Sequence, residues 1–264
     1  MKFPKTIYYS DEVNDEFSGF KVRDYKLSEN YVYIHNNVIY KFFAFIVYRI
    51  IMIPYAFFYL KLKYRFKIHN RKILKKFKNS GYFLYGNHTN IPADAYIPNM
   101  ISFPKRNYVI VNSQNFAIRG TRTFLAMCGG IPIADSFKGF KNFIEAIEKR
   151  SVNKNSITIY PEAHVWPFYT KIRPFKSTSF KYPIQFNEPS FSFTITYQKR
   201  KYSKKPRIVV YLDGPFYANY DLSPKERKED LRNRIYNKMV ERSKNNNIEL
   251  IKYIKKESNL WTTI

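Results

Sequence analysis

The chain has 264 residues, with 46 lysines and arginines against 20 aspartates and glutamates and a net charge of +26. Hydrophobic residues make up 45% and aromatic residues 19%, which supports a substantial core and excludes a largely disordered chain. The single cysteine excludes an internal disulfide scaffold and a cysteine-based zinc finger. A chain this basic could bind nucleic acid, an anionic membrane or a phosphorylated substrate. Composition alone does not choose among these partners.

The first 37 residues form a polar segment with scattered aromatic residues. Their net charge is −1, so the positive excess lies entirely in the rest of the chain. No apolar stretch follows the basic start, so we do not expect a signal peptide. We predict that residues 1–37 are an arm that lies over the rest of the protein.

An apolar, aromatic segment spans residues 38–60. Lys41 and Arg49 interrupt it, and an arginine near the middle of a bilayer costs at least about 2.5 kcal/mol. Pro54 is expected to kink a helix here, and the uninterrupted apolar run is too short to cross a bilayer about 30 Å thick. A helix or helix pair lying in the membrane interface fits better than a span, and a buried core helix is the alternative.

A strongly basic stretch follows directly, in residues 61–78. It contains nine lysines and arginines and no acidic residue. An apolar segment beside a polybasic one is typical of proteins that dock on anionic lipid, at about 1 kcal/mol per basic residue near the surface. We therefore predict that residues 38–78 form a helical, polybasic unit that associates with membranes.

From residue 79 onward, short apolar runs alternate with amphipathic stretches. This pattern predicts an α/β domain, residues 79–264, with a mixed, largely parallel sheet covered by helices. The predicted strands are residues 81–86, 107–112, 130–134, 156–160, 191–197 and 207–212, the last two suited to a hairpin. The predicted helices are residues 94–103, 119–128, 136–151, 176–187 and a last one from Ser223 to Asn245. Ser223, Pro224 and Glu226 mark the start of that last helix.

One loop of this domain combines an imidazole with a carboxylate. His88 follows the predicted strand 81–86, and Asp94 lies six residues later at a predicted helix start. Sites in open α/β sheets gather where loops leave the carboxyl ends of strands. A carboxylate that reaches the imidazole fixes its tautomer and stabilises its protonated form, which suits general-base catalysis. His35 and His69 lack this context and are expected to be structural.

A second strand exit, after residue 160, carries Glu162 and His164. Adjacent parallel strands would bring this loop and the His88 loop to one edge of the sheet. Lys171 and Arg173 follow without nearby acids, a pattern that suits a phosphate, with a solvated face as the plainer alternative.

Three blocks of the sequence resemble the glycerolipid (lysophospholipid) acyltransferase family, the PlsC-like enzymes that include 1-acylglycerol-3-phosphate acyltransferases. The blocks are Asn87-His88 with Asp94, then Gly130-Ile131-Pro132-Ile133, then Tyr160-Pro161-Glu162, in the family's order. The likeness extends over residues 38–215, including the apolar segment. It implies an O-acyltransferase that acts on a lysophospholipid or a related glycerolipid.

The resemblance also implies a mechanism. His88, oriented by Asp94, would take the proton from an acceptor hydroxyl, whose oxygen attacks the thioester carbonyl of acyl-CoA or an acyl-carrier protein. Because the thioester is already activated and the bound alcohol is held close, no acyl-enzyme is needed. The resemblance implies no metal and no cofactor besides the acyl thioester co-substrate. The helix N-terminus after residue 92 and the amides near Gly129 and Gly130 are candidate donors to the oxyanion.

The substrate-binding residues implied by the resemblance are Asn87, Glu162, Ala163, His164, Lys171 and Arg173. The chain departs from the family in two ways. One extra residue separates His88 from Asp94, and the three residues after Glu162 differ from the family's usual Gly, Thr or Ser, and Arg. The arginine that binds the acceptor's phosphate is therefore missing. We expect Lys171 or Arg173 to replace it, or the acceptor to differ from the usual phosphate-bearing glycerolipid.

The apolar and polybasic segments, together with this resemblance, predict the partners and the location. The partners are an anionic membrane surface, an acyl thioester donor and a lipid acceptor. The predicted location is the cytoplasmic face of the membrane, as a peripheral or monotopic protein. No specific nucleic-acid partner is expected.

Two other functions remain open at this stage. A metal-dependent hydrolase would use four ligands, His88, Asp94, Glu162 and His164, although no HxH or HExxH pair fixes their geometry. A nucleic-acid-binding protein would use basic, aromatic stretches such as residues 199–205, although no helix-turn-helix, RNP or zinc pattern supports it. Cys128 has no histidine or acid beside it in sequence and is expected to be a buried small residue rather than a nucleophile.

Overall fold

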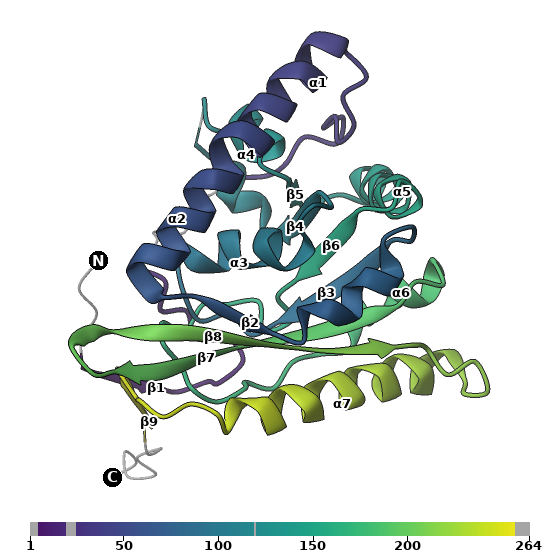
Figure 1. Cartoon of the computed structure of the whole chain (residues 1–264). Helices are drawn as coiled ribbons and strands as arrows, with labels where there is room; N and C mark the ends of the chain where they lie inside the picture. Colours follow the sequence, from purple (N-terminus) through teal and green to yellow (C-terminus); the bar gives the residue numbers. More distant parts are fainter. Residues whose placement is uncertain (1–4, 20–24, 119, 257–264) are drawn as a thin grey trace, which may run out of the picture.

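The computed structural model describes residues 5–19, 25–118 and 120–256. Its main sheet has seven strands in the order β2-β8-β7-β3-β6-β4-β5 (Figure 1). The strands are β2 (Lys67–His69), β3 (Tyr82–Gly86), β4 (Asn107–Val111), β5 (Gly130–Pro132), β6 (Ser156–Ile159), β7 (Ser190–Arg200) and β8 (Ser203–Phe216). Neighbouring strands are parallel except for the β7–β8 hairpin, which is antiparallel. The predicted mixed, largely parallel sheet is thus confirmed.

Helices pack on both faces of this sheet. They are α1 (Val38–Phe45), a π-helical segment (Ile46–Met52), α2 (Ile53–Tyr64), α3 (Ala93–Ser102), α4 (Arg122–Met127), α5 (Phe137–Val152), α6 (Lys181–Gln185) and α7 (Pro224–Ser243). Short 3₁₀ turns lie at Arg71–Phe77, Ser113–Phe116 and Thr178–Phe180. The predicted capping box at Ser223 is present, with Glu226 returning a hydrogen bond to the cap. The predicted helix 176–187 is shorter than expected, because only a 3₁₀ turn and the five-residue α6 form there.

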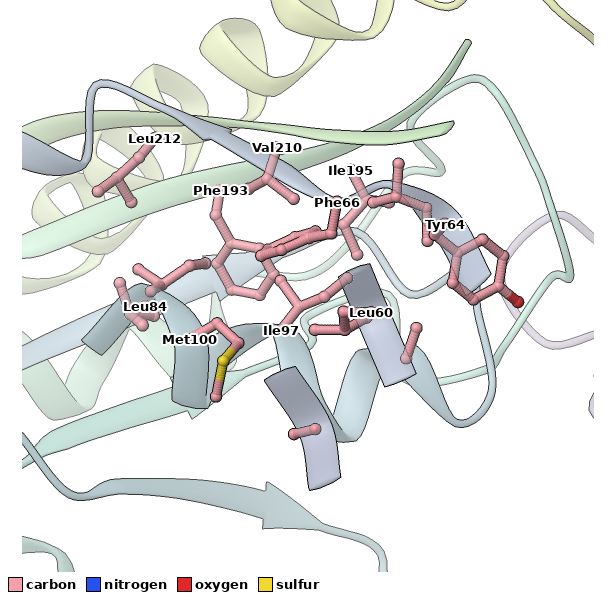
Figure 2. Close-up of a cluster of buried hydrophobic side chains, with 14 of the residues drawn as sticks. Leu60, Tyr64, Phe66, Leu84, Ile97, Met100, Phe193, Ile195, Val210 and Leu212 are labelled. Atoms are coloured by element: carbon pink, nitrogen blue, oxygen red, sulfur yellow. The ribbon is translucent and has the colours of Figure 1, made fainter. Parts of the chain in front are cut away.

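The sheet separates two hydrophobic cores. Strand β3 is buried along its whole length and directs alternate side chains to opposite faces, Leu84 to one core and Phe83 to the other. Figure 2 shows the first core, where Leu60 of α2 and Ile97 of α3 pack with Phe193 of β7. Helices α5 and α7 supply buried residues to the second core. Burial on both faces explains why the central strands are continuous apolar runs rather than alternating ones.

The apolar segment forms one continuous helix from Val38 to Tyr64, of 27 residues. At about 1.5 Å per residue the whole helix extends roughly 40 Å, long enough to cross a bilayer, although the uninterrupted apolar run within it is shorter. Pro54 falls in the first turn of α2, directly after the π-helical segment, so its missing N–H does not end the helix. Tyr48 and Leu60 are buried against the domain. The large exposed apolar residues of this helix are Val38, Ile39, Phe42, Phe43, Phe45, Ile50, Ile51, Tyr55, Phe57, Phe58 and Leu62.

A second, two-stranded sheet joins regions that are distant in sequence. Strand β1 (Thr6–Tyr9) of the arm pairs in parallel with β9 (Lys252–Lys255), which follows α7. Tyr9 and Tyr253 from these strands both pack on Trp166. The sequence patterns did not predict either strand. The described part of the arm therefore packs on the α/β domain, next to the loop that follows β6.

Candidate active site

The topology brings two loops to one edge of the sheet. Strands β3 and β6 are parallel neighbours, and Tyr85 pairs with Ile159 near their carboxyl ends. The loop after β3 carries His88, and the loop after β6 carries Glu162. The amide of His88 donates a hydrogen bond to the Glu162 carboxylate at 3.0 Å, which ties the two loops together. The predicted meeting of the two loops is confirmed.

His88 and Asp94 form a hydrogen-bonded pair in this edge. The distance from Nδ1 of His88 to Oδ2 of Asp94 is 2.7 Å. Asp94 lies in the first turn of α3 and is 2% exposed, whereas the His88 side chain is 21% exposed. With Nδ1 donating to the carboxylate, Nε2 is the nitrogen left to accept a proton. The predicted contact is confirmed, and the extra residue between the two side chains does not prevent it.

The two carboxylate oxygens of Asp94 differ in their hydrogen bonds. Its Oδ2 also accepts a hydrogen bond from the Asn90 amide at 2.8 Å, while Oδ1 is buried without a partner in the described structure. Burial raises the pKa of Asp94, and the hydrogen bond from His88 opposes that shift. The carboxylate is therefore held at an energetic cost that a proton on the imidazole would reduce.

Tyr160, the residue directly after β6, packs against the imidazole of His88. Its ring stacks on that of His88, with centroids 4.4 Å apart and planes 20° from parallel. Its hydroxyl donates to the backbone oxygen of Asp94 at 2.6 Å. In the sequence Tyr160 stands out only as part of a motif, and its contact with His88 was not predicted, because stacking between two loops leaves no periodic pattern. Tyr160 restricts the rotation of the imidazole and ties it to the start of α3.

Glu162 and Arg173 form a buried ion pair beneath the site. Glu162 is 3% exposed and Arg173 is fully buried, and Nη2 of Arg173 lies 3.4 Å from Oε2 of Glu162. Arg173 also donates to the backbone oxygens of Glu12 and His164. The option that Arg173 binds the acceptor is not supported, because its guanidinium is enclosed and engaged with the protein. Glu162 likewise holds the loops rather than facing a ligand.

Two further predicted binding residues have structural contacts. The Asn87 side chain donates to the carbonyl of Ile195 at 3.1 Å and accepts from its amide at 2.8 Å, so it fixes the His88 loop to β7. His164 is partly exposed, and its Nδ1 lies 2.8 Å from the Glu16 carboxylate of the arm. The predicted direct contact of Asn87 with substrate is not supported, because both polar atoms of its buried side chain are used.

Lys171 and Ala163 are the predicted binding residues that face solvent. Both are exposed, on the loop that carries Glu162. Ala163 has a φ of 63°, in the left-handed region that glycine adopts without penalty. The family resemblance places a glycine at this position, and the backbone of Ala163 has a conformation that glycine favours. Lys171 remains a candidate for the cation that the third block lacks.

The proposed metal ligands do not come together. Among the described residues, no group of three or more histidine, cysteine, aspartate or glutamate side chains is placed to hold a metal ion. Glu162 is engaged by Arg173, and His164 by Glu16. The ligand set of the metal-dependent hydrolase is therefore not assembled.

The two glycines proposed as oxyanion donors lie at the wrong edge. Gly130 begins β5 and pairs with Val109, and Gly129 donates its amide to Ala126 at 3.0 Å. Both thus lie at the amino end of the parallel strands, opposite His88, and the prediction is wrong for them. Cys128, at the same end, is partly rather than fully buried as expected, and burial raises the pKa of its thiol to about 11, which disfavours a nucleophilic role.

These observations define the class of protein: an α/β protein with a mixed sheet, in which the carboxyl edge of the sheet holds a histidine–aspartate pair beside a buried glutamate. The chain belongs to the Acyltransferase family, whose model matches residues 65–197, half of the chain. The fold is similar to that of PlsC from Thermotoga maritima, described as a 1-acyl-sn-glycerophosphate (LPA) acyltransferase. The TM-score is 0.55 with 15% identity, over 81% of this chain and 85% of that one. Among curated proteins, none matches.

Proposed function

We propose that this acyltransferase moves a fatty acyl group from a thioester donor, acyl-CoA or an acyl-carrier protein, to a hydroxyl of a lysophospholipid or related glycerolipid. The observation that carries the proposal is the 2.7 Å contact between His88 and Asp94 in a site open to solvent on the imidazole side. A histidine oriented by a buried carboxylate suits a reaction whose first need is to remove a hydroxyl proton. The activity named for the PlsC of similar fold supports the choice of acceptor.

In this mechanism His88 is the general base. Its Nε2 takes the proton of the acceptor hydroxyl as the oxygen attacks the thioester carbonyl, and Asp94 stabilises the imidazolium that forms. When the tetrahedral intermediate collapses, the C–S bond breaks and the imidazolium returns the proton to the departing thiolate. The protein needs no covalent intermediate, and its main contribution is to hold the two substrates close. Tyr160 and Asp94 keep the imidazole in position throughout.

The helix Val38–Tyr64 and the basic stretch after it support a membrane as the source of the lipid acceptor. Eight of the nine lysines and arginines in residues 61–78 are exposed, and the ninth, Lys63, is partly exposed. An apolar groove of about 510 Å³ lies beside this helix. Phe58 and Met100 are among its apolar lining residues, and Lys61 and Arg71 are its charged lining residues. We propose that the protein lies on the anionic, cytoplasmic face of a membrane, as a peripheral or monotopic protein.

Thiol release from acyl-CoA in the presence of lysophosphatidate tests the proposal. His88→Ala is expected to lower kcat/KM by about a thousandfold, because general-base catalysis is worth about 10² to 10⁴ in rate. His69→Ala is a matched control, since His69 lies in β2, away from the site. Unchanged thiol release by a folded His88→Ala protein would overturn the assignment of the base. No release by the wild type with any lysolipid acceptor would overturn the choice of substrate.

A further inference from the structure

A second cavity lies at the opposite end of the sheet from His88. It has a volume of about 280 Å³, and Arg106, Tyr108 and Asn155 line it at the amino ends of β4 and β6. Lys41 of α1 and Arg150 of α5 also line it. The five residues of β4 span about 16 Å, so this cavity is separated from the catalytic edge by the depth of the sheet. We call it the amino-end pocket.

The charges of the amino-end pocket are all of one sign. Lys41, Arg106, Lys149 and Arg150 line it, and no aspartate or glutamate is among its lining residues. In the described parts of the chain, none of these four cations forms an ion pair with a carboxylate. Partly buried charges are normally paired, because removing them from water is costly. Arg106 and Arg150 are partly buried whereas Lys41 and Lys149 are exposed, so the two unpaired arginines indicate a missing anionic partner.

The two arginines are held in place by contacts that leave their charge uncompensated. Nη2 of Arg106 donates to the carbonyl of Met127 at 2.6 Å, and Nη2 of Arg150 donates to that of Tyr33 at 2.6 Å. Both guanidinium groups lie against the Tyr108 ring, at 5.1 Å and 4.5 Å from its centroid. The Nε of each is buried without a hydrogen-bond partner in the described structure. The pair is thus fixed in geometry before any ligand arrives.

A purely structural role explains only part of this arrangement. Lys149 and Arg150 lie in the last turn of α5, where the helix dipole favours cations. That effect does not extend to Arg106, which precedes β4, or to Lys41 on α1. Four cations from three separate elements converge on one cavity. Two guanidinium groups with two ammonium groups are the donors that recognise phosphate in proteins.

We propose that the amino-end pocket binds a phosphate group carried by a small organic molecule or by a lipid headgroup. Tyr40 and His35 line the same cavity and stack on each other at 3.9 Å, which provides a flat wall for the organic part. Tyr40 and Lys41 belong to α1, whose neighbouring residues Phe42 and Phe43 are exposed. A headgroup in the pocket would thus place its lipid tails beside apolar helix surface. The proposal does not depend on the chemistry assigned to His88.

The test uses the full-length protein and two kinds of probe. For soluble phosphate, the Tm is measured with inorganic phosphate or glycerol 3-phosphate against sodium chloride at the same ionic strength, since a ligand that binds only the folded state raises the Tm. For lipid, co-sedimentation compares phosphatidylcholine vesicles that contain equal shares of phosphatidic acid or phosphatidylserine. The pocket variants are Lys41→Gln/Lys149→Gln, at exposed residues, and Arg106→Lys. The control, Lys138→Gln/Lys141→Gln, makes the same charge change on exposed positions at the start of α5.

A soluble ligand predicts a phosphate-specific rise in Tm for the wild type and the control, and an affinity at least about tenfold weaker in the pocket variants. A lipid ligand predicts no such rise, but a preference for phosphatidic acid that the pocket variants lose by a similar factor and the control keeps. Either result supports the proposal and identifies the source of the phosphate. Two results overturn it: the wild type distinguishes neither probe from its matched control, or both pocket variants bind as the Lys138→Gln/Lys141→Gln control does.

Discussion

The two ends of the main sheet differ in how their charged side chains are paired. At the carboxyl end each of three carboxylates has a basic side chain beside it: Asp94 faces His88, Glu162 faces Arg173, and Glu16 of the arm faces His164. At the amino end four cations line one cavity without a carboxylate among its residues. One fold thus contains an edge where charges are satisfied internally and an edge where they are left for a ligand.

This difference shows that the net charge of +26 is a poor guide by itself. Arg173 and Arg150 are both largely enclosed cations, yet one stabilises a loop and the other is left without an opposite charge. What separates them is the identity of the neighbouring groups, which composition does not record. The paired charges at the carboxyl end differ mainly in burial, so each pair is expected to contribute a different amount.

The largest effect is expected for the fully buried pair. Glu162→Gln keeps the shape and one oxygen acceptor for the His88 amide but leaves the Arg173 charge buried and unpaired. The free energy of unfolding should fall by about 3–5 kcal/mol, measured by urea denaturation. Burial raises the pKa of Glu162, so the intact pair itself contributes little net stability. Glu162→Gln/Arg173→Met should therefore recover much of the loss, and a double variant as unstable as the single one would contradict this account.

The next effect separates activity from stability. Asp94→Asn should lower kcat about a hundredfold, because the amide cannot stabilise the imidazolium as a carboxylate does. It should not lower the free energy of unfolding at neutral pH. Burial raises the folded pKa of Asp94 above its ordinary value of 3.8, so the ionised carboxylate opposes folding, increasingly as pH rises from that value through the folded pKa. Denaturation of both proteins from pH 4 to 8 checks this, and a large loss of stability at pH 7 would refute it.

The sequence predicted the parts of the site that are close together in the chain. His88 and Asp94 are six residues apart, within one loop and the helix start it leads to, so strand and helix patterns were enough to expect their contact. The central strands were predictable because burial on both faces makes them apolar runs. Strand β3 and the capped start of α7 are such cases, where local pattern and tertiary environment agree.

The rest depended on contacts that sequence spacing does not contain. Strand β1 pairs with β9 at the other end of the chain, and each has only four residues, too few for a clear periodicity. In the sequence Arg173 has no acid nearby, as expected of an exposed phosphate-binding residue. Only the folded loop shows that it is buried and paired with Glu162. The amino-end pocket is lined by Lys41, Arg106 and Arg150, which come from separate segments of the chain, so no sequence motif could predict it.

The smallest effect is expected for the exposed pair that fastens the arm. Burial alone would raise the pKa of Glu16, but hydrogen bonds from His164 and Ser18 outweigh it and lower the pKa below the ordinary 4.5. Glu16 therefore stabilises the fold above that value, and its contribution is lost as pH falls through the lowered pKa. Because both side chains are about one-third exposed, Glu16→Gln should cost only about 0.5 kcal/mol at pH 7.

Comparison of unfolding at pH 7 and pH 3 checks this, with Glu229→Gln on the polar helix α7 as the matched control. The difference between Glu16→Gln and wild type should shrink toward pH 3, as the Glu16 carboxylate takes up a proton. A cost above about 2 kcal/mol at pH 7 would mean that the arm depends on this pair rather than on Trp166, whose indole N–H donates to the backbone of Asp15 at 2.7 Å. That result would mean that an exposed ion pair contributes as much to stability as a buried one. The contribution of these pairs would then not follow their burial.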